Sequence, residues 1–441
     1  MPGFTAVVLN IIAIGLIAMM SYQGLTRRVE FFSYRNVYLL GFIMFQLVGG
    51  AAVIATAGYE YMPIERPRQA INLYLVYVII YLVVYLLSYH WSRLVGWVAQ
   101  WFRPKQPMET SDWLLLLVAL GFVAYAVFNR FIGYRIPGYG LLIFLIPAEA
   151  AATAIVGWVW GGRRFNVAVI ALGGFVFASC LFLSVYGIAS RRPLIAVCGA
   201  LAWGAWYRRG FQINPVKLVI WALPVVLLSM YFVGGWTKAR RVVRFEGRAM
   251  DAIRQMLDTP PGEAFATVLE GSHDSRLTLW ALDAYPERHE RRHLFSFRYM
   301  FYHPIPRSLW QDKPVPLSKD VARLANLKGV NASAITLPPC VTGYANAEGG
   351  IYALFLYALF FGQFTRFFDE VLRQNPGMPF VILAAGCVLG DLVGLARGDI
   401  AIMTNRITIG FLTVWFLFLI ARTIIARTPA AQSQFYMAPR Y

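Results

Sequence analysis

Long apolar runs recur along this chain and leave few folds open to it. One of them, "LYLVYVIIYLVVYLLSY" from Leu73 to Tyr89, contains no charged residue. A helix of about 20 apolar residues crosses a hydrocarbon core of roughly 30 Å, whereas barrel strands alternate in polarity. Charged residues make up 14% of the chain, against about 25% in soluble proteins. The sequence therefore predicts an all-α polytopic membrane protein.

The apolar runs predict a bundle of about eleven transmembrane helices. We expect spans near residues 4–22, 37–58, 70–89, 112–128, 138–160, 166–188, 193–207, 218–236, 347–365, 378–396 and 400–421. The expected organisation is residues 1–236 with the first eight helices, residues 237–346 as one large loop, and residues 347–441 with the last three helices and a tail.

Basic residues fall in every second connection between the predicted spans. Lysine and arginine gather in the connections that face the cytoplasm, so the N-terminus and the loop at 237–346 are expected outside and the C-terminus inside. The same residues account for much of the net charge of +18. A nucleic-acid partner is therefore not expected.

The large loop is rich in arginine. It contains 16 basic and 11 acidic residues, and 12 of the basic residues are arginines. The arginine fork binds phosphate oxygens through two hydrogen bonds, although a solvated surface with ordinary ion pairs would also carry such residues. Helical spacing predicts an amphipathic helix over 263–284, and a second, aromatic helix over 291–303 ends before Pro304 and Pro306. The aromatics of 291–303 can line the membrane interface or stack on sugar rings.

Several charged residues are expected at the outer ends of the spans. Arg307 lies in "HPIPRSLWQDKP" (303–314), where two prolines stiffen the backbone. Arg191 and Arg192 lie between two predicted spans, and Arg397, Asp399 and Arg406 lie between two others. Charges near membrane depth are costly and often functional, although long side chains also anchor helices at the interface.

Glu348 is the one carboxylate at the mouth of the predicted span 347–365, and no basic residue lies within four positions of it. A partly desolvated carboxylate has a raised pKa and can accept a proton near neutral pH. The alternative is an anion at a helix N-terminus, which contributes well under ~1 kcal/mol when it is exposed. The sequence has no HxxH or DxD spacing, no Walker A motif and no dinucleotide-binding fingerprint, so neither a metal nor a cofactor is expected.

Four segments together resemble the bacterial oligosaccharide repeat-unit polymerases, the O-antigen and exopolysaccharide polymerases of the Wzy type. These segments are "SRRPLIA" (190–196), "IPRSLWQDKP" (305–314), "GYANAEGGIYALFLYALFFG" (343–362) and "LARGD" (395–399), within a many-helix bundle that has one large outer loop late in the chain. The resemblance covers roughly residues 180 to 410. Eleven spans depart from the even number usual in the family, whose two termini both lie inside.

The resemblance implies a glycosyltransferase of the inner membrane with a C-type fold that works without metal on the periplasmic side. It implies transfer of the growing glycan from undecaprenyl pyrophosphate to a hydroxyl of the incoming repeat unit, with a chain-length regulator and a flippase as further partners. Carried onto this sequence, the site has three groups of residues: Glu348 and then His303 as the base; Arg191, Arg192, Arg307 and Arg397 at the phosphates; and Trp310, Tyr299 and Tyr344 at the sugars.

Three other functions stay open at the level of sequence. An O-antigen ligase would share this layout and transfer the glycan to a lipid A core. A transporter or flippase for the same lipid would show internal repeats and charges deep within its spans. A structural membrane component would bind other proteins and need no catalytic motif.

Overall fold

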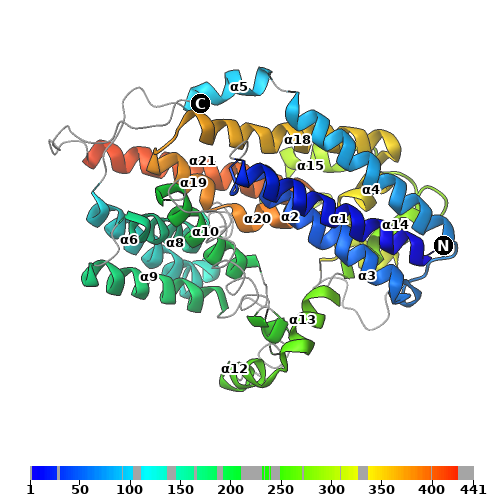
Figure 1. The fold of residues 1–441 in the computed structure, drawn as a ribbon, viewed down its shortest axis with the longest axis horizontal. Coiled ribbons are helices and arrows are strands. Elements are labelled where there is room, and N and C mark those ends of the chain that lie inside the picture. The colour runs from blue at the N-terminus through cyan, green and yellow to red at the C-terminus, as the bar shows by residue number, and fades with distance from the viewer. Residues whose placement is uncertain are drawn as a thin grey trace.

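The computed structural model describes residues 2–26, 30–91, 93–102, 111–136, 146–162, 166–185, 192–209, 231–232, 234–237, 239, 249–270, 273–307, 309–325, 336–398 and 400–425. Within these ranges the chain is helical and forms no strand (Figure 1), which confirms the predicted all-α class. The helices up to residue 209 are α1 (Pro2–Leu25), α2 (Tyr34–Phe42), η1 (Ile43–Val48), α3 (Gly49–Ala55), η2 (Gly58–Tyr61), α4 (Pro67–His90), α5 (Arg93–Ala99), η3 (Gln100–Phe102), α6 (Asp112–Phe131), η4 (Gly133–Arg135), α8 (Ala148–Gly162), α9 (Val167–Val185) and α10 (Arg192–Arg209). The later helices are α12 (Ala249–Asp258), α13 (Pro261–Glu270), α14 (His273–Ala284), α15 (Phe295–Tyr302), α16 (Leu317–Leu324), α17 (Cys340–Gly349), α18 (Ile351–Gln374), α19 (Pro379–Gly386), α20 (Leu389–Leu395) and α21 (Ile400–Ile425).

Seven helices in the described part are long and apolar enough to cross a membrane. They cover Pro2–Leu25, Tyr34–Ala55, Pro67–His90, Asp112–Phe131, Val167–Ser184, Ile351–Gln374 and Ile400–Ala421. The protein is thus built as a helical membrane protein, and the total of eleven spans stays a prediction. Most of the expected span at 218–236 lies outside the described residues, and α8 has 15 residues where the sequence predicts a longer span from 138.

Two expected spans are interrupted in the structure. The run 378–396 is not one helix, because it breaks at Cys387 and Val388 into α19 and α20, both too short to cross a bilayer. Hydropathy does not detect such a break, since both halves remain apolar. The expected span at 347–365 begins at Ile351, because Gly350 adopts a φ of 66° and separates α18 from the buried α17.

A second group of helices, α6, α8, α9 and α10, packs beside the rest of the bundle (Figure 1). Two glycines bring α8 and α10 into close contact. A Cβ added to Gly204 would lie 2.1 Å from the Ala154 carbonyl oxygen, and one added to Gly157 would lie 2.0 Å from the Leu201 carbonyl oxygen. Small residues at such crossings let helix backbones pack tightly in a membrane.

Gly204→Ala should therefore lower the thermal unfolding temperature of the purified protein. Overpacking of this kind costs about 1–3 kcal/mol. Gly199→Ala on the same helix is the control, because nothing lies within 4 Å of an added Cβ there. Equal unfolding temperatures for the two variants would contradict the close crossing.

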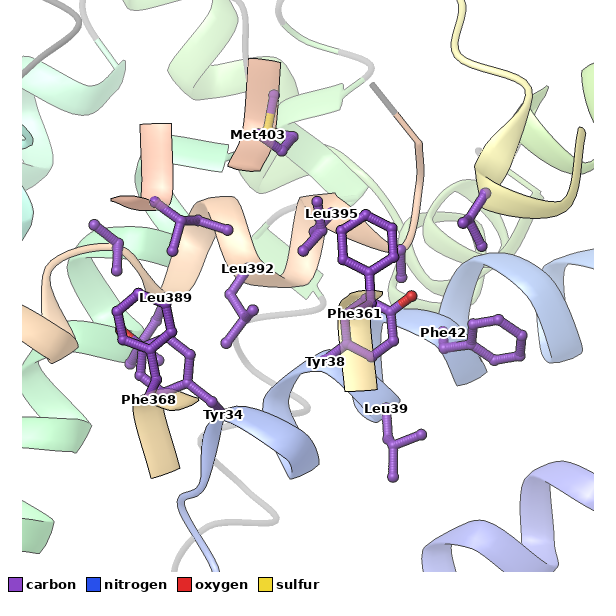
Figure 2. Close-up of a cluster of buried hydrophobic side chains, with 14 of the residues drawn as sticks. Tyr34, Tyr38, Leu39, Phe42, Phe361, Phe368, Leu389, Leu392, Leu395 and Met403 are labelled. Carbon is purple, nitrogen blue, oxygen red and sulfur yellow. The ribbon is translucent and has the colours of Figure 1, made fainter. Parts of the chain in front are cut away.

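In one part of the core, aromatic side chains of α2 and α18 lie beside leucines of α20 and Met403 of α21 (Figure 2). Tyr34 stacks on Phe368 with ring centroids 4.4 Å apart, and Tyr38 packs on Phe361 at 6.0 Å. Hydroxyl groups in this core have partners: Tyr34 Oη donates to the Ala385 carbonyl at 2.7 Å. The tyrosines of the apolar α4 run are thus compatible with membrane depth, because their hydroxyls are also bonded, as between Tyr85 and Thr365 at 2.9 Å.

The large loop is partly folded onto the bundle. Its predicted amphipathic helix at 263–284 is two helices, α13 and α14, of which α14 packs against α3, α4 and α17. Leu277, Trp280 and Ala281 are buried there, as their helical spacing predicts. In Figure 1, α12 lies at the edge of the molecule, whereas α14 and α15 lie within the bundle, and α13 contacts α3.

Candidate functional site

The aromatic helix α15 brings the proline-rich segment 303–314 to the start of α21. It ends at Tyr302, where the sequence predicts, because Pro304 and Pro306 cannot continue it. His303 follows as the C-cap, and its N–H donates to the Tyr299 carbonyl at 2.7 Å. Asn405 of α21 donates through Nδ2 to the Met300 carbonyl at 2.7 Å, which ties the two helices together.

Lys313 folds the proline-rich turn back onto α15. Its Nζ donates to the carbonyls of His303 and Ile305, both at 2.8 Å, and lies 5.5 Å from the centre of the Tyr299 ring. Lys313 is 7% exposed. Burial lowers its pKa, and the positive charges of Arg307 and Lys319 lower that pKa further. Lys313 is therefore a cation that the turn itself holds in place.

His303 is surrounded by cations. Burial lowers its pKa to about 4, with further contributions from Lys313, Arg406 and Lys319 in that order. At neutral pH the imidazole is uncharged and can accept a proton or a hydrogen bond. Arg406 comes from α21, where its Nε lies 3.3 Å from Oδ2 of Asp391 on the broken-helix segment α20.

Acid should destabilise the protein through His303. Its folded-state pKa lies below the ordinary value near 6.5, so the unfolded chain binds more protons between about pH 6.5 and pH 4, and stability falls as pH drops through that window. In His303→Asn, the unfolding temperature should fall less steeply over the same window. Matching slopes for the two proteins would show that His303 does not titrate as its surroundings indicate.

Exposed apolar side chains lie on the same segment as these cations. Phe301 and Leu309 are each 80% exposed, and Ile305 is 37% exposed. Arg307 stands between Ile305 and Leu309 in sequence, is exposed, and makes one long contact within its own turn, from Nη1 to the Gln311 carbonyl at 3.4 Å. The turn thus offers hydrocarbon and positive charge side by side.

Two of the other predicted phosphate residues, Arg192 and Arg397, lie in the described part of the chain. Arg192 begins α10 and reaches α21 through a 3.5 Å contact between Nη1 and the Met403 sulfur. Arg397 is half-buried at the end of α20. Arg191 and Asp399 lie outside the described residues. Of the predicted arginines, Arg307 follows α15, Arg192 contacts α21, and Arg397 lies three residues before α21 begins.

The predicted sugar-binding aromatics are mostly packed inside the protein. Tyr344 is 1% exposed, and its hydroxyl accepts the Ser318 N–H at 3.1 Å. Tyr299 is 4% exposed and stacks on Phe295. Trp310 is half-buried against Tyr302, with ring centroids 5.3 Å apart. Trp310 is the only one of the three predicted aromatics that keeps a partly open surface.

Glu348 differs most from its expected setting. It lies in the last turn of α17, before the break, and not at the N-terminus of a span. Its side chain has no exposure. It accepts hydrogen bonds from the Ser296 N–H at 2.8 Å, from Ser296 Oγ at 2.6 Å and from the Tyr357 hydroxyl. Burial raises the pKa of Glu348, and these hydrogen bonds oppose that rise. The expected partly desolvated carboxylate at the mouth of a span is therefore a fully enclosed carboxylate inside the protein, and the alternative of an anion at a helix N-terminus is wrong for its own helix.

Sequence reasoning missed the return of Lys313 onto its own turn and the ion pair between Arg406 and Asp391. Asp391 carries a recognisable signal, because an ionisable residue inside an apolar run is functional by default. No sequence signal indicates that Arg406 lies near His303, since about a hundred residues separate them in the chain.

Comparison with family models, curated proteins and solved structures finds no match for this chain. Function is therefore inferred from the residues and their arrangement.

Proposed function

We propose that this chain polymerises lipid-linked oligosaccharide repeat units at the periplasmic face of a bacterial inner membrane. The growing glycan leaves undecaprenyl pyrophosphate and joins a hydroxyl of the incoming repeat unit. The α15–α21 region, with the turn after α15, is the proposed binding site for the pyrophosphate.

The supporting observation is the combination of cations and exposed hydrocarbon on the segment 301–319, with Arg406 added from α21. Lys313, Lys319 and Arg406 lie close enough to His303 to lower its pKa, and Phe301 and Leu309, on the same chain segment as His303, are exposed. A polyprenyl pyrophosphate has the same two parts, a charged head and a hydrocarbon tail. Preorganised cations stabilise the charge that develops on a leaving pyrophosphate.

The proposed reaction breaks one bond and forms one. The acceptor hydroxyl attacks the anomeric carbon of the donor glycan, and the bond from that carbon to the pyrophosphate oxygen breaks with its electron pair on the oxygen. The hydroxyl proton passes to the neutral imidazole of His303. A bound pyrophosphate would offset the surrounding cations and raise the pKa of His303, which makes it a better base when substrate is present.

Analysis of lipids from a strain that lacks this protein tests the proposal. Single repeat units should accumulate on undecaprenyl pyrophosphate, and expression of the intact chain should restore the polymer. Full-length chains left on undecaprenyl pyrophosphate would favour a ligase, and repeat units confined to the cytoplasmic leaflet would favour a flippase.

A further inference from the structure

Beside the break between α17 and α18, one buried carboxylate of α17 joins its own helix to two other helices, α15 and α18. Glu348 belongs to α17, Ser296 to the first turn of α15 and Tyr357 to α18. Both carboxylate oxygens are engaged: Oε1 by the Ser296 hydroxyl, and Oε2 by the Ser296 N–H and the Tyr357 hydroxyl. With no exposed surface, this carboxylate has no open path to an acceptor hydroxyl in the described arrangement.

The backbone just before α15 runs alongside the last turn of α17 and is hydrogen-bonded to it. The N–H of Arg292 donates to the Ala347 carbonyl, and the N–H of Leu294 donates to the Glu348 carbonyl, both at 2.9 Å. His293 and Leu294 have φ values of 43° and 53°, a left-handed conformation that is unfavourable for non-glycine residues and persists only where the surroundings hold it.

Glu348 also caps α15. The helix N-cap is Leu294, whose side chain offers no oxygen, and free N–H groups at a helix start need acceptors. The Glu348 carboxylate supplies one to Ser296, and a negative charge there also suits the helix dipole. The opposite end of the same eight-residue helix leads directly into His303.

We propose that Glu348 is a positioning residue that fixes α15, and thereby His303 and the turn after it, in the orientation that transfer requires. This role rests on the proposed function for its consequence, although the fixing of α15 is a property of the fold alone. The Glu348 carboxylate acts through Ser296 and does not touch the substrate.

A spin label on α15 tests the positioning without any need for transfer activity. Phe301→Cys supplies an exposed labelling site, and Cys198→Ser removes an exposed native thiol, whereas Cys180, Cys340 and Cys387 are buried. Glu348→Gln should raise the label's mobility, because glutamine replaces one acceptor oxygen with a donor. Tyr357→Phe keeps the carboxylate and removes one bond, so it should raise mobility less. Glu290→Gln is the matched control, since Glu290 is an exposed carboxylate before α15.

Transfer by the same variants separates positioning from chemistry. We expect Glu348→Gln to lower transfer about 10-fold and Tyr357→Phe to lower it less, and both variants should keep the pH profile of the unmodified protein. Loss of a general base would instead lower transfer roughly 10²-fold or more and remove one limb of that profile.

Unchanged label mobility in Glu348→Gln overturns the proposal. If the unmodified protein shows no transfer, the proposed function fails, and the mobility result still decides whether Glu348 fixes α15. If Glu348→Gln does not fold, label mobility in Tyr357→Phe still tests whether Glu348 fixes α15.

Discussion

Arg406→Gln should lower glycan transfer by about 10²- to 10³-fold, the loss typical for one preorganised electrostatic contact to a developing charge. Arg406 approaches His303 from α21 and is held by Asp391, 3.3 Å from its Nε. In the proposed site, this ion pair places the guanidinium before substrate binds.

The Arg406 variant needs a background that protects folding. Asp391 is 8% exposed, and an unpaired buried charge costs about 3–5 kcal/mol. Arg406→Gln should therefore be measured together with Asp391→Asn, which removes the stranded charge, and compared with Asp391→Asn alone. Asp391→Asn alone should lower transfer in part, because it releases Arg406 from its ion pair. Transfer by the double variant within a few-fold of the unmodified protein would exclude a role for Arg406 at the phosphate.

Arg307→Ala should lower transfer by roughly 10- to 100-fold, because a hydrogen bond to a charged group contributes about 1.5–3 kcal/mol. Folding should be unaffected, since the side chain is exposed and makes one long contact within its turn. Arg307→Lys keeps the charge and loses the two-pronged geometry, so its transfer should fall between those of the alanine variant and the unmodified protein.

A nearby arginine provides the control for Arg307. Arg298 is exposed on α15 and donates to the carbonyls of Arg292 and His293. Arg298→Ala removes the same charge from the same surface, and we expect transfer close to that of the unmodified protein. Equal losses at both positions would indicate a general effect of surface charge and exclude a specific role for Arg307 in binding phosphate.

Local features of the fold could be predicted from the sequence, because they depend on neighbouring residues. The apolar runs identify the long helices such as α4 and α18, and Pro304 predicts the end of α15. The break in 378–396 could not be predicted, since both halves are predominantly apolar. Gly350 is a local signal for a break, because glycine readily adopts a positive φ. The sequence permits this φ without requiring it, and the position of Glu348 before the break depends on it.

The candidate site was less accessible to sequence reasoning, because its parts come from distant segments. The stiffness of the turn around Arg307 follows from its prolines, but the return of Lys313 onto Tyr299 depends on the folded turn. The approach of Arg406 depends on how α21 packs on α15. The enclosure of Glu348 depends on Ser296 and Tyr357, which look like ordinary residues of aromatic helices.

Transfer by the purified protein in lipid nanodiscs tests the central claim most directly. Supplied only with undecaprenyl-pyrophosphate-linked repeat units, the protein should form a ladder of longer glycans and release one undecaprenyl pyrophosphate for each bond formed. The ladder should persist with EDTA present and disappear in Arg406→Gln in the Asp391→Asn background. Repeat units that remain single in the presence of folded protein, or that move only when a lipid A core is added, would contradict the account.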